Sequence, residues 1–103
     1  MRDDVFPDGL LLSPVRALAW IDAPLFGTLT VADLGDLFDL EVQPEFLLVG
    51  TGIGLRQPPR PFVRELEARG IGVEVMDSRA AARAWGVLRA EERWIVAALL
   101  PLI

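Results

Sequence analysis

The stretch that decides the fold is FLLVG at residues 46–50, followed after a loop and a helix by GVEVM at residues 72–76. The first run is continuously apolar, which predicts a strand covered on both faces. Between the two runs, Pro61 suits the first turn of a helix and Gly70 suits its end. A strand–helix–strand unit of this length is typical of a right-handed crossover between parallel strands. We therefore expect an α/β fold, and we interpret Gly72–Met76 as a second buried strand.

A second helix and a last strand follow this unit. Asp77 or Ser78 is a suitable cap for a helix over Arg79–Trp85, which is rich in alanine and ends before Gly86. The apolar run Trp94–Leu100 predicts a final buried strand.

The chain before residue 46 is less regular. Leu10–Ser13 and Ala17–Ile21 are short apolar runs separated by a turn at Pro14, so we predict an N-terminal β-hairpin. Thr30, with Asp33 three residues later, resembles a helix capping box and predicts a short helix.

Length and composition exclude several kinds of chemistry. A chain of 103 residues has the size of one domain, so we assign residues 1–103 to a single domain. It contains no Cys, His, Lys, Tyr or Asn, which excludes thiolate nucleophiles, histidine triads, His or Cys metal sites and lysine Schiff bases. We therefore expect no cofactor and no metal site, and the composition favours a protein without enzymatic activity over an enzyme.

The charge is unevenly placed along the chain. Residues 1–50 have a net charge of −7 and residues 51–103 a net charge of +2, which gives −5 overall. Nucleic-acid binding needs a net basic surface, so we do not expect a nucleic-acid partner. The opening residues lack a signal-peptide pattern, and the longest apolar run is much shorter than the ~20 residues of a membrane-spanning helix. We expect a cytoplasmic protein with no membrane partner.

Several short motifs of the second half resemble one family. They are GTG at 50–52, GIGVEVMDS at 70–78, AAR at 81–83, VL at 87–88 and AAL at 97–99. The chain is similar to the small uncharacterised domain family that includes a mitochondrial respiratory complex I assembly factor and an adipogenesis-associated cytosolic protein. The resemblance covers 46–100, and GIGVEVMDS is its most specific part.

The resemblance implies a three-layer α/β domain with a central mixed sheet, two or three helices and the N-terminal hairpin. It also implies that the last strand runs antiparallel to its neighbours, and that an opening strand of many relatives is absent or shortened here. Where relatives carry Cys, this chain has Ala82, so any thiol chemistry of those relatives is excluded.

The loop Thr51–Arg60 follows a buried strand and leads into a helix, which is where open α/β sheets place ligands. Gly50, Thr51 and Gly52 begin this loop, and its backbone N–H groups, together with Arg56 and Arg60, are candidates for binding a small anion. The alternative is that the glycines only allow the chain to turn, since the dinucleotide fingerprint and the Walker lysine are both missing.

Asp77 and Ser78 follow the adjacent strand, and we expect them to lie beside Thr51. Helix capping is the favoured role for Asp77; a general base with a pKa raised by burial is the alternative. Together with Arg79 and Arg83, these residues complete a rim formed by residues 51–60 and 77–83.

Two functional hypotheses follow from these observations. The favoured one is a non-catalytic partner-binding or assembly-type domain that contacts an unknown protein, or a second copy of itself, through the rim. The alternative is a protein that binds a small anionic ligand through the Gly50–Gly54 loop.

Overall fold

A five-stranded mixed sheet forms the centre of the computed structural model, which describes residues 9–20, 23–24 and 26–101. The strand order is β2-β1-β5-β3-β4. The strands are β1 Leu10–Leu12, β2 Ala17–Ala19, β3 Phe46–Gly50, β4 Gly72–Met76 and β5 Val96–Leu99, and the helices are α1 Arg60–Ala68 and α2 Ser78–Ala90. Two short 3₁₀ helices, Phe26–Thr28 and Val31–Leu34, precede β3.

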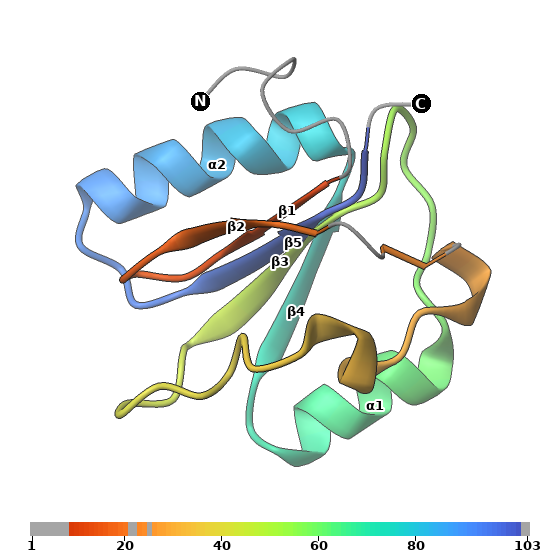
Figure 1. Cartoon of the computed structure of the whole chain (residues 1–103), viewed down its shortest axis with the longest axis horizontal. Helices are drawn as coiled ribbons and strands as arrows, with labels where there is room; N and C mark the ends of the chain where they lie inside the picture. The colour runs from red at the N-terminus through yellow and green to blue at the C-terminus, as the bar shows by residue number, and fades with distance from the viewer. Residues whose placement is uncertain (1–8, 21–22, 25, 102–103) are drawn as a thin grey trace.

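The sheet separates two layers of helices. Figure 1 shows α2 on one side of the sheet, with α1 and the 3₁₀ segments on the other. Because neighbouring residues of a strand point to opposite faces, Leu47 and Val49 pack into the core beneath α1, while Leu48 packs beneath α2 with Ala81. This arrangement is the three-layer α/β fold with a mixed sheet that the resemblance implied.

The direction of the last strand differs from our expectation. β5 runs parallel to β3 and antiparallel to β1, so it joins the parallel and antiparallel halves of the sheet. The expectation that it runs antiparallel to its neighbours is wrong for β3. The helix α2 carries the chain back across the sheet after β4, which lets β5 enter beside β3 in the same direction.

β4 is an edge strand rather than the buried strand that we expected. It pairs only with β3 among the described residues, and Gly72 and Glu74 are exposed while Val73, Val75 and Met76 are half-buried. The alternation of valine and glutamate in GVEVM was a signal for this half-exposed position.

The second helix is longer than predicted. α2 continues through Gly86 and ends at Ala90, five residues beyond the expected end at Trp85. A Cβ placed on Gly86 would meet nothing within 4 Å. Glycine therefore serves here as an ordinary, weakly helix-forming residue on an exposed face, and neighbouring packing overrides its low propensity.

The predicted helix at Thr30 is a single 3₁₀ turn. Asp33 Oδ2 accepts a hydrogen bond from the Thr30 N–H at 2.8 Å, as expected for a capping box, and a second one from the Thr30 hydroxyl at 3.0 Å. Gly35 adopts a positive φ of 58° directly after Leu34 and ends the element. The start was therefore predictable, but the following glycine keeps the segment short.

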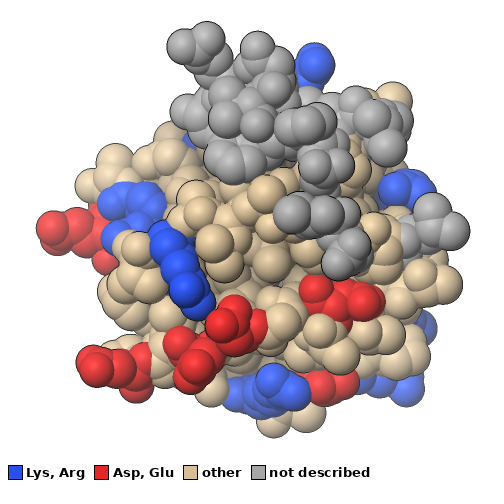
Figure 2. Space-filling view, viewed as in Figure 1, with Lys and Arg blue, Asp and Glu red and all other residues tan. Residues whose placement is uncertain are grey.

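Acidic and basic groups lie side by side on the face of the molecule seen in Figure 1. Figure 2 shows acidic groups gathered over the lower half of this face, where Figure 1 draws the 3₁₀ segments and the connection to β3, with basic groups among them. The part of this face that the described residues form thus lacks the continuous basic surface typical of nucleic-acid-binding proteins.

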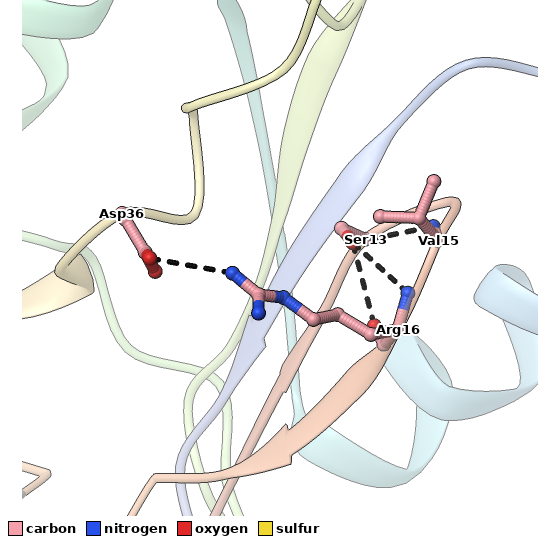
Figure 3. Close-up of polar contacts among 4 residues, drawn as sticks. All are labelled: Ser13, Val15, Arg16 and Asp36. Atoms are coloured by element: carbon pink, nitrogen blue, oxygen red, sulfur yellow. Dashed lines mark hydrogen bonds and ion pairs between the residues drawn. The ribbon is translucent and has the colours of Figure 1, made fainter.

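The N-terminal hairpin is confirmed, with Leu10 paired to Ala19 and Leu12 to Ala17. In its turn, Ser13 Oγ accepts from the backbone N–H groups of Val15 at 3.3 Å and of Arg16 at 3.2 Å (Figure 3). The Arg16 side chain forms an exposed ion pair of 3.3 Å with Asp36. The expected end of the second hairpin strand at residue 21, and the question of an opening strand in residues 1–8, lie outside the described residues.

A second ion pair holds together the starts of two strands. Arg93 Nε and Nη2 donate to the Glu45 carboxylate at 3.0 Å and 2.9 Å, just before β5 and β3 begin. These hydrogen bonds lower the pKa of Glu45 and raise the pKa of Arg93. The pair lies at the end of the sheet opposite the candidate site, and it is too exposed to contribute much to stability.

Candidate functional site

The carboxyl ends of β3 and β4 meet where the sequence placed the candidate site. The Thr51 N–H donates to the Met76 carbonyl at 2.9 Å, and the Ser78 N–H donates to the Gly52 carbonyl at 2.8 Å. Parallel pairing of β3 and β4, with Gly50 beside Met76, aligns these two strand ends. Thr51 and Asp77 therefore lie side by side, as expected.

The hydroxyl of Ser78 connects three segments. Ser78 Oγ accepts from the Gly52 N–H at 2.9 Å and donates to the Leu100 carbonyl at 2.8 Å. The side chain is buried, with 5% of the residue exposed, so both backbone groups depend on it rather than on water. Ser78 thus connects the segments that follow β3 and β5 to the first turn of α2 through hydrogen bonds.

Thr51 is also buried, with 1% exposed, and its hydroxyl donates to the Gly54 carbonyl within the same loop. Gly50 lies so close to α2 that a Cβ would stand 2.7 Å from Ser78 Oγ and 2.9 Å from Ser78 Cα. Glycine is required at this position because the strand and the helix approach each other closely.

Asp77 is the N-cap of α2. Its Oδ1 accepts from the Ala80 N–H at 2.9 Å, and its backbone is extended, as expected for a cap residue. We call this constellation of Gly50, Thr51, Gly52, Asp77 and Ser78 the strand-end junction. Its polar side chains are all engaged in hydrogen bonds that hold the fold.

The two candidate anion-binding arginines do not converge. Arg56 lies 4.7 Å above the ring of Phe26, and its Nη2 donates to the Thr51 carbonyl at 3.3 Å. Arg60 begins α1 and lines a different hollow, formed with α1 and β4. Moreover, the N–H groups of Thr51 and Gly52 are used by Met76 and Ser78, so the start of the loop does not offer them to an anion.

The remaining predicted residues, Arg79 and Arg83, are exposed on α2. Within the described ranges, no group of three or more acidic side chains is arranged to hold a metal ion. None of the described helices is long and apolar enough to cross a membrane.

Sequence reasoning missed the apolar part of the site. Ile53 and Leu55 have 70% and 62% of their surface exposed, although they are large aliphatic residues. Ile53 lines a hollow of about 660 Å³, together with Phe26, Leu100 and Pro101. The signal was available in the loop sequence TGIGLR, where two aliphatic residues separate the glycines and Arg56.

The fold and the site together define a class of protein. It is a three-layer α/β domain in which hydrogen bonds hold the strand-end junction and an exposed apolar loop lies beside it. Residues 1–100 match the family of proteins of unknown function DUF498/DUF598. The chain belongs to this family.

Two relatives illustrate what is known in the family. An uncharacterised protein of Rhodobacter capsulatus is 36% identical over 94 residues, which cover 91% of this chain and 69% of the relative. The NADH dehydrogenase [ubiquinone] 1 alpha subcomplex assembly factor 3 of Danio rerio is 37% identical over 88 residues, 85% of this chain. The chain matches half the length of the zebrafish protein. Membership of this chain in the family that includes a complex I assembly factor is thus confirmed. That the family also includes an adipogenesis-associated protein stays a prediction.

Solved structures agree with the fold. A protein of Bordetella parapertussis is 38% identical, with a TM-score of 0.78 over 93% of this chain and 80% of that protein. A protein of Bordetella pertussis described as an Mth938-like domain is 33% identical, with a TM-score of 0.73 over 94% of this chain and 75% of that protein.

Proposed function

We propose that this chain is a non-catalytic partner-binding or assembly-type domain of the cytoplasm. Its partner is another protein or a second copy of the chain, and the contact surface is the rim formed by residues 51–60 and 77–83. The observation that carries this proposal is the exposure of Ile53 and Leu55 on a loop that the strand-end junction holds in place.

The loop is well suited to recognition because its base is fixed. The Thr51 hydroxyl bonds to the Gly54 carbonyl, and the Arg56 guanidinium bonds back to the Thr51 carbonyl. Both contacts restrict the segment that carries Ile53 and Leu55. Binding then orders few additional side chains, which reduces the entropy lost on association.

The chemistry of the junction favours binding over catalysis. A general base must reach a substrate proton, but the described contacts of Asp77 direct Oδ1 to the Ala80 N–H. The hydroxyls of Ser78 and Thr51 donate to backbone carbonyls, and both residues are buried. The zebrafish relative is named as an assembly factor, which supports a role in contacting other proteins.

The test is to purify the tagged chain, after mild cross-linking, from the organism that encodes it. The double variant Ile53→Ser/Leu55→Ser removes the exposed aliphatic surface. We expect the amount of stoichiometric partner measured by mass spectrometry, or of homo-oligomer measured by sedimentation, to fall at least ten-fold. The free energy of unfolding of the double variant should differ from that of the wild type by less than about 0.5 kcal/mol, because both substituted side chains are exposed.

The matched control is Val42→Ser/Val87→Ser, since each of these valines is 61% exposed but lies outside the rim. The control should retain the partner. A wild-type chain that stays monomeric and recovers no stoichiometric protein would contradict the proposal, as would equal losses in the two double variants.

Binding of a small anion through the Gly50–Gly54 loop is less well supported, because Arg60 lines a different hollow from Arg56. One observation favours it: Arg56 lines the hollow beside the strand ends, together with Thr51 and Gly52. Thermal stabilisation by an anionic metabolite that disappears in Arg56→Ala would establish this second function in place of the first.

A further inference from the structure

The outer edge of β4 exposes backbone hydrogen-bonding groups. The Gly72 N–H donates to Glu45 and the Met76 carbonyl accepts from Thr51, so residues 72, 74 and 76 direct their backbone toward β3. In a strand the backbone groups alternate, and those of Val73 and Val75 therefore point away from the sheet. No strand among the described residues pairs with them. Such an edge is able to accept one more strand.

A groove runs along this edge, between β4 and α1. It has a volume of about 550 Å³, and its apolar lining includes Val73 and Val75 from β4 and Val63 from α1. These valines are half-buried, so the groove already has a formed apolar floor. Glu74 is exposed on the other face of β4 and does not line the groove.

Two basic side chains and one acidic side chain, Glu67, line the same groove from α1, so its lining has a net charge of +1. Arg60 and Arg64 are exposed, and neither makes an ion pair within the described part of the chain. They are four residues apart on one helix, which places them about 6 Å apart along its axis. Alternate side chains of an extended strand are spaced by about 6.6 Å. Two acidic residues at positions i and i+2 of a bound strand therefore match the two arginines.

We propose that the groove between β4 and α1 binds an extended acidic segment of a partner protein, which adds to the sheet as a sixth strand. The backbone of this segment pairs with the outward N–H and C=O groups of Val73 and Val75. Its side chains on the α1 face combine two acids, which meet Arg60 and Arg64, with an aliphatic residue that packs on Val63. This is strand addition, in which the main chain supplies affinity and alternate side chains supply specificity.

This surface meets the rim of the proposed function at Gln57, Pro58 and Arg60, but it does not include the exposed aliphatic residues of that rim. Ile53 and Leu55 do not line the groove, and Val75 and Arg64 do not belong to the rim. The two surfaces can therefore be disabled independently, and failure of one proposal leaves the other standing.

The experiment uses a phage library of random nonapeptides, selected on the full chain. We expect enrichment of peptides with acids at two alternate positions and an aliphatic residue on the same face. The best peptide is then labelled with fluorescein, and its Kd is measured by anisotropy for the wild type and for each variant.

The decisive variant is Val75→Pro, which removes one outward N–H without removing a bond to β3. Proline is tolerated where the N–H of an edge strand faces solvent. We expect the Kd to rise at least ten-fold. Val75→Thr is the matched control, because it keeps the N–H and the branched shape, and its Kd should change by less than three-fold. Circular dichroism and thermal unfolding establish that each variant is folded.

A charge variant tests the second half of the proposal and remains informative if Val75→Pro fails to fold. Arg64→Glu should raise the Kd at least ten-fold, whereas Arg16→Glu should leave it within two-fold, because Arg16 is also exposed but lies in the β1–β2 turn, at the opposite edge of the sheet. The proposal is overturned by a selection without acidic enrichment, by equal effects of the two charge variants, or by a chain that dimerises through β4 instead.

Discussion

The strand-end junction and the groove beside β4 use their polar groups in opposite ways. At the junction, the side chains of Thr51, Asp77 and Ser78 bond to the chain itself. In the groove, the outward backbone of β4 and two arginines of α1 have no partner among the described residues. Polar residues that look like a functional site in the sequence can thus have structural roles, while the groove that we propose for binding is formed largely by valines at a sheet edge.

The largest loss of unfolding free energy that tests this comparison is expected for a substitution of Ser78. Ser78→Ala leaves the Gly52 N–H and the Leu100 carbonyl buried without their partner, and we expect a loss of about 3 kcal/mol of unfolding free energy. The control is Ser13→Ala, whose hydroxyl also accepts from backbone N–H groups but in an exposed turn (Figure 3), where water replaces it. We expect it to lose less than about 1 kcal/mol.

Urea unfolding followed by tryptophan fluorescence measures both serine variants, since the chain has three tryptophans. If the two variants lose similar amounts of unfolding free energy, the buried hydroxyl of Ser78 does not stabilise the junction. The contrast between a junction whose polar groups hold the fold and a groove whose polar groups are unpaired would then be wrong.

The next largest loss of unfolding free energy is expected at one of two glycines of the loop, Gly50 and Gly54. Gly50→Ala puts a methyl group 2.9 Å from the Ser78 Cα, and because backbone must move we expect a loss of about 2 kcal/mol. Gly54→Ala meets nothing within 4 Å and should lose less than about 0.5 kcal/mol. Thermal unfolding of the pair gives the difference directly; a tolerated alanine at position 50 would show that the junction is looser than the structure indicates.

The smallest effect is expected at Asp77. Asp77→Ala removes the acceptor for the Ala80 N–H and should reduce the unfolding free energy by about 1 kcal/mol. Asp77→Asn keeps an oxygen acceptor and should lose only a few tenths of that amount. Urea denaturation at neutral pH measures both. A loss in Asp77→Asn as large as in Asp77→Ala would mean that the negative charge, and not the capping bond, is the important property.

Much of the fold was predictable because local signals agreed. The continuous apolar run at residues 46–50, Pro61 in the first turn of α1 and Gly70 after its end identified the strand–helix–strand unit correctly. The length of α2 was mispredicted at Gly86, because packing of the helix against the sheet outweighs a single weak residue. The proximity of Thr51 and Asp77 was predicted, but the exposed apolar residues beside them were not, since exposure depends on what other segments cover.

The sequence by itself determined which side-chain chemistries these residues cannot supply, which segments form most of the strands and helices, and that Thr51 and Asp77 follow two successive strands. Residue types and their spacing fix these properties locally. Only the tertiary structure decided that β4 is an edge, that β5 runs parallel to β3, and that Ser78 bonds to residues 52 and 100. Strand order and burial arise from contacts between segments far apart in the chain, and no local pattern specifies which segments will meet.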